Sequence, residues 1–379
     1  MQKEIDTALL HMAHEINEHR SELLSINAQD VASCDRSDVS LYDRLFMDDK
    51  KITGMIESLQ SVQSKPSPLH RSLYQFRHEN GMMIENKTVP FGTILIVYES
   101  RPDVTVEATA TALKSGNRII LKGGKEARNS NVLLSKCWTK ALVAAGLDKE
   151  MVRYLDLNRT DFQHFLRAPD TDIDLIIPRG GQKLIDFVHS VARCPVMVSG
   201  RGNNFLYVSK FADLEVARSL IIASKTSKIS ACNALDKVLI NKDLPDSFFI
   251  ELAAELAKKG VEIINEPTAE IWQEEFLDMK IVLEKVSDLS EAVKLINKYS
   301  GKHSATIVTK KESEADFFME KVDCAAVYHN ASTRFTDGFQ FGLGAEMAIS
   351  TQKLHHRGPL GIEHLVTNKW YIKGNGQIR

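Results

Sequence analysis

Residues 93–122 read TILIVYESRPDVTVEATATALKSGNRIILK, and this stretch decides the fold class. An apolar strand at residues 93–98 is followed by a helical segment with small residues on one face, 104–114, and by a second strand, 118–122. Gly116-Asn117, between helix and second strand, is a helix-stop signal. Repeated units of this form predict an α/β fold in which helices cover both faces of a parallel sheet.

The same pattern continues outside this stretch. A further strand is predicted at 174–178, and after Gly202 the alternation restarts in a second, smaller α/β domain. Residues 1 to about 60 place apolar side chains near a 3.6-residue period, which predicts helices. The strands of the second domain are predicted at 205–208, 238–240, 306–309 and 325–328.

Two segments are predicted to be extended. Residues 74–89 have the turn-rich flanks of a hairpin, and residues 368–379 read as a tail. Such a hairpin often pairs with another subunit, although a ribbon packed on its own domain is the alternative. We therefore expect three parts, residues 1–200 with the hairpin, residues 201–350, and residues 351–379 as a C-terminal return and tail.

Composition excludes several classes of function. The chain has 379 residues, of which 43% are hydrophobic and 26% charged, and its net charge of −2 argues against nucleic-acid or anionic-membrane binding. No apolar run approaches the roughly 20 residues that span a bilayer, and the polar start shows no signal peptide. Five widely spaced cysteines without a Cys-x-x-Cys pair argue against a disulfide scaffold or a zinc site. The expected location is the reducing cytoplasm.

Cys232 is the strongest candidate for chemistry. It lies in Ser227-Lys228-Ile229-Ser230-Ala231-Cys232-Asn233-Ala234, among small and polar residues just before a predicted strand. A nucleophilic thiolate needs a reachable, electropositive site, and Lys228 could supply part of that field. The alternative is a small buried hydrophobe, which is the commoner role of cysteine.

Two glycine-bearing turns follow predicted strands. They are Lys122-Gly123-Gly124-Lys125 and Arg179-Gly180-Gly181. Ligand phosphates bind where strands end and helices begin, so either turn could hold one. Neither has a phosphate-loop consensus, and each could be only a tight turn.

Three further features attract attention. Arg101 follows the first parallel strand, where a guanidinium can grip a carboxylate or phosphate, although a surface ion pair is commoner. The polar loop 330–338, which contains Asn330 and Arg334, is long enough to be functional. His355-His356 has adjacent side chains that point apart and no obvious carboxylate partner, so we expect no metal there.

Together these blocks resemble the gamma-glutamyl phosphate reductases, a family of the aldehyde dehydrogenase superfamily. The resemblance runs from about Val89 to the C-terminus. Its longest blocks are Tyr98-Glu99-Ser100-Arg101-Pro102, Leu121-Lys122-Gly123-Gly124-Lys125-Glu126-Ala127, Cys232-Asn233-Ala234, and 330–346 followed by Ser350-Thr351-Gln352-Lys353-Leu354-His355.

The resemblance implies a fold and a reaction. It implies a Rossmann-like cofactor domain at 1–200, a catalytic domain at 201–350, and oligomerisation through the hairpin and tail. The implied reaction is the NADPH-dependent reduction of L-glutamyl 5-phosphate to L-glutamate 5-semialdehyde and phosphate, in proline biosynthesis. Cys232 would form a thioester, and the position aligned with the superfamily's oxyanion asparagine is Ser100, a weaker donor.

The resemblance also assigns ligand contacts. NAD-using relatives place a glutamate on the ribose 2′-hydroxyl where this chain has Lys125, which predicts NADP(H) bound at both glycine turns, with Glu275 near the nicotinamide ribose. Arg101, Asn330 and Arg334 are the candidates for substrate binding. Val198 stands where hydrolytic relatives carry a water-activating glutamate, which suits a thioester that phosphate must resolve. Less typical of the family are Arg201, Asn203-Asn204-Phe205, Lys228-Ile229 and Asp103.

Two alternatives remain open at this point. One is another aldehyde or acyl-CoA dehydrogenase, which CoA-dependent activity would reveal. The other is a non-catalytic relative that partners glutamate kinase, against which the intact Cys232-Asn233-Ala234 block argues. We expect a homo-oligomer, either dimer or tetramer, with no metal.

Overall fold

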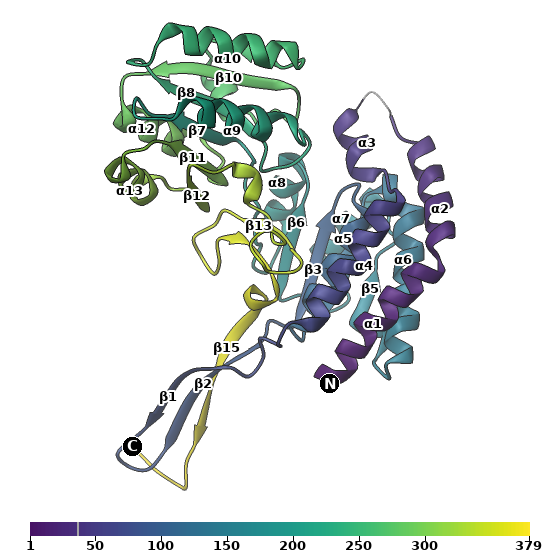
Figure 1. The fold of residues 1–379 in the computed structure, drawn as a ribbon. Coiled ribbons are helices and arrows are strands. Elements are labelled where there is room, and N and C mark those ends of the chain that lie inside the picture. The colour runs from purple at the N-terminus through teal and green to yellow at the C-terminus, as the bar shows by residue number, and fades with distance from the viewer. Residues whose placement is uncertain (36–37) are drawn as a thin grey trace. The chain divides into compact units, whose positions relative to one another are not determined.

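The computed structural model describes residues 1–35 and 38–379, and the chain divides into two compact units (Figure 1). Unit 1 comprises residues 1–198, 342–348 and 360–379, and unit 2 comprises residues 199–341 and 349–359. The first boundary falls close to the expected residue 200. Residues 342–348, which we expected in the second domain, lie instead in unit 1, because Met347 and Ala348 are backbone-bonded to Leu360 and pack in the unit 1 core.

Four helices open unit 1, and the first, second and fourth pack against two later helices of the same unit. Asp48 caps the fourth helix, because its carboxylate accepts the Lys51 backbone N–H at 2.8 Å. The four helices are α1 (Gln2–Glu18), α2 (Arg20–Ala32), α3 (Val39–Leu45) and α4 (Asp49–Ser64).

The main sheet of unit 1 is parallel throughout, in the order β5-β4-β3-β6. Its strands are β3 (Thr93–Tyr98), β4 (Arg118–Lys122), β5 (Val152–Tyr154) and β6 (Leu175–Arg179). One face packs on α5 (Pro102–Lys114) and α6 (Arg128–Ala144), and the other on α7 (Arg159–Arg167) and α8 (Gln182–Val191).

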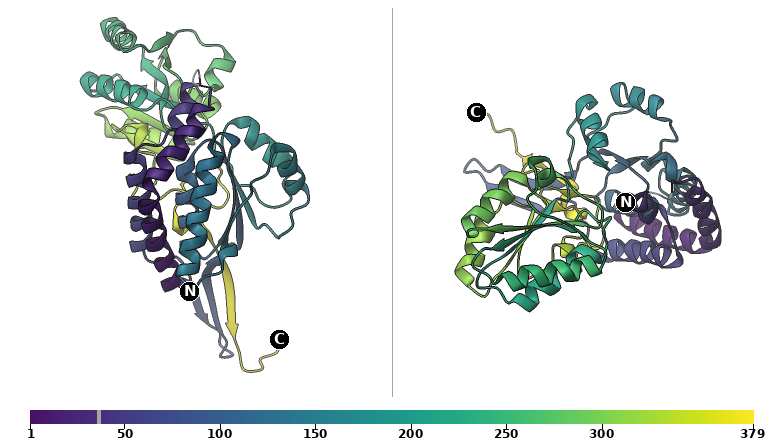
Figure 2. Two further views of the ribbon diagram at one scale, coloured as in Figure 1. Left: turned by 90° about the vertical axis from the view of Figure 1, so that its right-hand side faces the viewer. Right: turned by 90° about the horizontal axis from the view of Figure 1, so that it is seen from above.

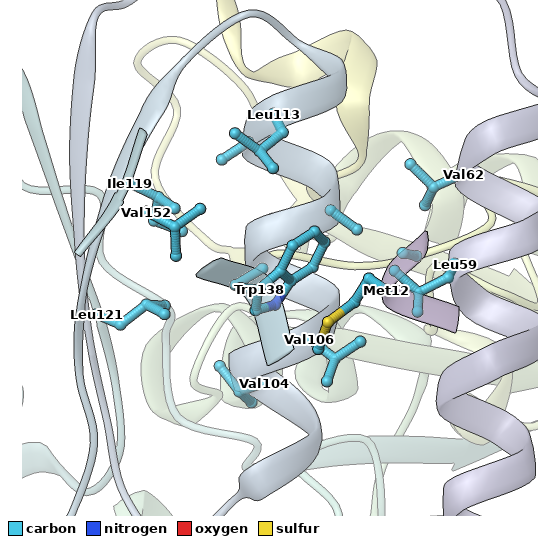
Figure 3. Close-up of a cluster of buried hydrophobic side chains, with 14 of the residues drawn as sticks. Met12, Leu59, Val62, Val104, Val106, Leu113, Ile119, Leu121, Trp138 and Val152 are labelled. Carbon is cyan, nitrogen blue, oxygen red and sulfur yellow. The ribbon is translucent and has the colours of Figure 1, made fainter. Parts of the chain in front are cut away.

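Trp138 on α6 lies at the centre of the unit 1 core. Side chains from α1, α4, α5, β4 and β5 gather around it (Figure 3). Its indole N–H donates to the Thr105 carbonyl of α5 at 3.1 Å, so the ring is buried without an unsatisfied donor. Small side chains on α5, such as Ala108 and Ala112, allow this close packing.

A three-stranded antiparallel ribbon also belongs to unit 1. It consists of β1 (Ser72–Arg77), β2 (Met83–Pro90) and β15 (Val366–Lys373), in the order β1-β2-β15. Figure 1 shows the three strands side by side. The expected hairpin is therefore present, and the first half of the expected tail, up to Lys373, is a strand because β2 supplies its hydrogen-bonding partner.

The sheet of unit 2 is also parallel throughout, in the order β12-β11-β7-β8-β10-β9. Its strands are β7 (Asn204–Val208), β8 (Leu235–Asn241), β9 (Glu262–Ile264), β10 (Lys280–Val286), β11 (Ser304–Val308) and β12 (Ala326–His329). Helices α9 (Leu214–Thr226) and α10 (Asp246–Lys258) cover one face, and α12 (Leu289–Tyr299) and α13 (Glu312–Lys321) cover the other (Figure 2).

Short elements complete the chain. They are α11 (Ala269–Gln273), the pair β13 (Ile349–Ser350) and β14 (Gly358–Pro359), and the 3₁₀ turns η1 (Lys125–Ala127), η2 (Lys149–Met151), η3 (Thr333–Phe335) and η4 (Ile362–His364). Within the described ranges, no helix combines the length and apolarity that a membrane crossing requires. The predicted α/β fold class is confirmed.

Candidate active site

Cys232 lies in the loop that joins α9 to β8, at the amino end of a central strand of unit 2. The side chain is half-buried, so a substrate can reach it. Lys228, in the same loop, is exposed. The thiol therefore lies where the sequence predicts, at the start of a buried strand.

The other four cysteines are poor nucleophiles. Burial raises the pKa of the Cys137 and Cys324 thiols to about 11. Burial also raises the pKa of the Cys34 and Cys194 thiols. A raised pKa lowers the thiolate fraction near neutral pH, which disfavours these four thiols as nucleophiles.

Arg334 lies within electrostatic range of Cys232. Burial lowers the pKa of its guanidinium, and the negative charges of Cys232 and Asp337 offset only part of that effect. The arginine is held by a hydrogen bond from Nε to Ser227 Oγ at 3.2 Å. A half-buried cation within electrostatic range of the thiol can stabilise both a thiolate and an incoming phosphate.

Asn330 lies at the opposite end of the same loop. Its carboxamide donates to the Thr309 carbonyl at 2.9 Å and accepts the Thr309 N–H at 3.1 Å, just beyond the carboxyl end of β11. From there the chain runs back along β11, since Ala331 bonds to Thr306 and Thr336 to Ser304 at the amino end. The structure therefore places Arg334 within electrostatic range of Cys232, whereas the Asn330 amide is bonded to Thr309 in a turn.

Glu275 is half-buried and lies between two anchored neighbours. Lys237 Nζ donates to the Glu274 carbonyl at 2.8 Å, and the Phe276 N–H donates to Asp236 Oδ2 at 3.0 Å. Burial lowers the pKa of Lys237 to about 8. Sequence reasoning missed these anchors, although charged residues at the start of a buried strand were a signal.

In unit 1, Ser100 and Arg101 follow β3. The Ser100 hydroxyl is buried and, among the described residues, no group hydrogen-bonds to it. Arg101 is half-buried at the start of α5. Burial raises the pKa of the nearby Glu107 carboxyl to about 8, and the negative charge of Asp103 adds to this effect.

The first glycine turn ends β4. A Cβ on Gly123 would lie 2.3 Å from Asn131 Nδ2, and one on Gly124 would lie 3.3 Å from the Ser100 backbone nitrogen. Lys122 Nζ donates to the Gly123 carbonyl at 2.7 Å, whereas Lys125 is exposed at the start of η1. Backbone without side chains beside an exposed lysine fits a phosphate-bearing ligand.

The second glycine turn, after β6, already contains a carboxylate. The Gly181 N–H donates to Glu99 Oε2 at 3.2 Å, and a Cβ on Gly180 would lie 2.5 Å from the Glu99 side chain. A ligand phosphate would therefore share this turn with Glu99.

Potential metal ligands form one compact group among the residues that the structure describes, namely Glu15, His19 and Cys137. The Lys140 ammonium lies 3.3 Å from Glu15 Oε2 and 3.3 Å from His19 Nε2. The lysine side chain therefore already neutralises the charge of this carboxylate. The His355 and His356 rings contact each other edge to face.

Comparison with known proteins identifies the family. The model of the aldehyde dehydrogenase family matches residues 2–264. The chain belongs to the aldehyde dehydrogenase family. It is thus an oxidoreductase that acts on an aldehyde with a nicotinamide cofactor.

Individual relatives narrow the resemblance. The gamma-glutamyl phosphate reductase of Clostridium acetobutylicum is 40% identical over 386 residues, which cover 98% of this chain and 92% of the relative. The crystal structure of the gamma-glutamyl phosphate reductase of Thermotoga maritima matches with a TM-score of 0.92 and 38% identity, covering 100% of this chain and 95% of that one. An acetylating aldehyde dehydrogenase of Geobacillus thermoglucosidasius shares only the fold, with a TM-score of 0.73, 16% identity and coverage of 100% and 93%. The resemblance to the reductase family is confirmed.

Proposed function

We propose that this chain reduces L-glutamyl 5-phosphate with NADPH, giving L-glutamate 5-semialdehyde and phosphate, as a cytoplasmic enzyme of proline biosynthesis. The observation that carries the proposal is the half-buried Cys232 with the Arg334 guanidinium in its electrostatic range. Near-full-length similarity to reductases of that name supports the choice of substrate.

The covalent step begins at Cys232. The thiolate attacks C5 of the acyl phosphate, a C–S bond forms, and the C–O bond to phosphate breaks as phosphate leaves with the electron pair. Arg334 suits the role of holding the phosphate, because a half-buried guanidinium can bind it with two charge-assisted hydrogen bonds. Arg101 is the corresponding candidate for the substrate carboxylate.

When bound, the cofactor would supply a hydride to the thioester carbon, and collapse of the resulting oxyanion would expel the Cys232 thiolate and release the aldehyde. Both steps pass through an oxyanion that needs a donor. Ser100 is the candidate for this role, because it aligns with the superfamily's oxyanion asparagine.

The cofactor proposal rests on the first glycine turn. Gly123 and Gly124 let the turn pack closely against Asn131 and Ser100 beside Lys122, and the exposed Lys125 favours a 2′-phosphate over a free 2′-hydroxyl. Gly180 and Gly181 would border the same ligand, with Glu275 at the nicotinamide ribose.

A base that activates water would promote hydrolysis of the thioester. Val198 occupies the position where hydrolytic relatives carry a glutamate, so phosphate remains the acyl acceptor in the reverse direction.

The ribbon suits a homo-oligomer. Cross-strand register places Tyr74 in one row with Trp370, and Phe76 two rows further on, and so on the same face, with Ile84 and Ile372. Directly opposite residues share a face of a sheet, so these side chains form one apolar face. All six residues of β1 are exposed, which favours pairing with another copy.

The test is the reverse reaction, reduction of NADP⁺ by glutamate semialdehyde, measured with phosphate, with CoA, or with neither acceptor. We expect turnover that requires phosphate. Turnover that requires CoA would instead support an acyl-CoA dehydrogenase, and no turnover with any acceptor would support the non-catalytic alternative.

A further inference from the structure

The carboxamide of Asn204, the first residue of β7, holds the peptide that carries Cys232. Its Nδ2 lies 2.8 Å from the Cys232 carbonyl oxygen and 2.7 Å from the carbonyl oxygens of both Gly202 and Ala234. Its Oδ1 accepts the Ser304 backbone N–H at 3.0 Å. The side chain is fully buried, so water does not compete for these bonds.

A second carboxamide, that of Asn233, bonds the same loop segment, residues 232–234, to the loop that carries Arg334. Asn233 Nδ2 donates to the Thr336 carbonyl at 2.9 Å and to the Arg334 carbonyl at 3.1 Å. The Asn233 carbonyl accepts from Thr333 Oγ1 at 2.8 Å. These bonds tie the backbone of the nucleophile loop to the backbone that carries Arg334.

The two carboxamides belong to one network. Ser304 Oγ and Thr336 Oγ1 are 2.6 Å apart, and Thr336 Oγ1 also lies 2.7 Å from the Tyr328 hydroxyl. A closed circuit therefore runs from Asn204 through Ser304, Thr336 and Asn233 back to the Cys232 peptide. In such a circuit, displacement of one member strains the others.

Only an asparagine suits position 204. Three carbonyl oxygens need donors and one N–H needs an acceptor, which a carboxamide provides with its two N–H groups and its oxygen, one N–H being shared. A carboxylate would face three carbonyl oxygens, and an apolar side chain would remove the donor that all three share.

The loop also has no space in which to shift toward β7. A Cβ on Gly202 would lie 1.9 Å from the Cys232 carbonyl oxygen and 2.6 Å from its Cα. The register of β7 and β8 changes at this point, between Asn204 and Phe205.

We propose that Asn204 is a positioning residue, which fixes the Cys232 peptide so that the thiol stays aligned with Arg334 for attack. The inference deepens the proposed function and rests on its assignment of Cys232 as the nucleophile. It also gives a physical reason for a residue that is atypical of the family.

The test compares Asn204→Ala with a matched control, Asn203→Ala. Asn203 is equally buried and also donates two hydrogen bonds, to the Trp272 carbonyl at 2.7 Å and the Tyr299 carbonyl at 2.9 Å, but those carbonyls lie outside the Cys232 loop. The first readout is the rate at which iodoacetamide alkylates the Cys232 peptide, followed by mass spectrometry across pH. The second readout is the separation of kcat from KM in the phosphate-dependent assay.

We expect Asn204→Ala to change the alkylation rate of Cys232 and the pH profile of that rate. We also expect kcat to fall about 100-fold while KM changes less than about threefold, because a displacement of a reacting group by about 1 Å lowers the rate by about this factor. Asn203→Ala should destabilise the fold to a similar degree and leave the alkylation profile as in wild type. Alkylation does not depend on which substrate is used, so a failure of the proposed substrate would not alter this result.

Equal alkylation profiles in wild type, Asn203→Ala and Asn204→Ala would overturn the proposal. If Asn204→Ala does not fold, Asn204→Ser serves instead, because its hydroxyl is too short to bond all three carbonyls. The same change in the Ser variant supports the proposal, and a wild-type profile there overturns it.

Discussion

The glycine turn after β4 and the Cys232 loop before β8 both lie at strand ends, yet they keep their shapes by opposite means. The turn relies on absent side chains, since a Cβ on Gly123 or Gly124 would meet neighbouring atoms. The loop relies on two buried carboxamides, Asn204 and Asn233, that bond to backbone carbonyls. In the proposed function a cofactor binds at the turn and Cys232 needs a fixed position, so we expect substitutions in the two regions to change different kinetic constants.

The largest expected effect comes from Gly202→Ala, which adds a side chain to the nucleophile loop. The new Cβ would meet the Cys232 backbone at 1.9 Å, so the loop must move. We expect kcat to fall about 100-fold or more, with KM for the cofactor little changed. Steady-state kinetics in both substrates measure this split.

Two controls sharpen the prediction. Gly54→Ala in α4, where no atom lies within 4 Å of the new Cβ, should keep full activity. Gly123→Ala should raise KM for the cofactor more than it lowers kcat. Equal effects of Gly202→Ala and Gly123→Ala on both constants would remove the distinction between the two regions.

A smaller effect is expected from Lys125→Glu in the cofactor turn. Replacing an exposed cation by a carboxylate should lower kcat/KM for NADPH about tenfold, because a charge-assisted contact to phosphate contributes roughly 1.5–3 kcal/mol. The value for NADH should rise or stay the same. Initial rates with both cofactors test this, with Lys149→Glu as a control for net charge. Equal wild-type rates with NADPH and NADH, unchanged in the variant, would count against NADP specificity.

The smallest effect on activity at neutral pH is expected from His303→Asn, next to the loop network. Burial lowers the pKa of His303 from 6.5 to about 4, and its Nδ1 lies 2.8 Å from Ser304 Oγ. Between pH 6.5 and about 4, His303 is protonated in the unfolded chain but neutral in the folded one. Its contribution to the free energy of unfolding is therefore complete above pH 6.5 and is lost as the pH falls through about 4. The loss is about 3 kcal/mol.

Urea denaturation of wild type and His303→Asn between pH 7 and pH 4 measures this contribution. The wild-type free energy of unfolding should fall more steeply than that of the variant. Parallel curves would show that His303 does not titrate in this way.

Parts of the fold could be read from the sequence and others could not. Strands β3 and β4 and helix α5 were predictable because apolar runs, small residues and the Gly116 stop signal lie close together in the chain. Strand β10 was not predicted, since Glu284 and Lys285 interrupt its apolar run. The pairing of β15 with β2 depends on a partner almost 300 residues away, which no local pattern encodes.

The candidate site shows the same division. Cys232 was predictable from its small polar neighbours, and Arg334 from the composition of its loop. Asn204 was noticed only as atypical, because its partners Cys232 and Ser304 lie 28 and 100 positions away. The bond between the Asn330 amide and Thr309 was not predictable for a similar reason, since Asn330 follows β12 and Thr309 follows β11, and the two meet because these strands pair.

The most direct test of the account is a rapid-mixing experiment with glutamate semialdehyde and NADP⁺ in the absence of phosphate. A Cys232 thioester without an acceptor predicts a burst of NADPH equal to the enzyme concentration, then steady turnover only when phosphate is added, and no burst in Cys232→Ala. Sustained turnover without phosphate, or a burst that survives in Cys232→Ala, would contradict the central claim.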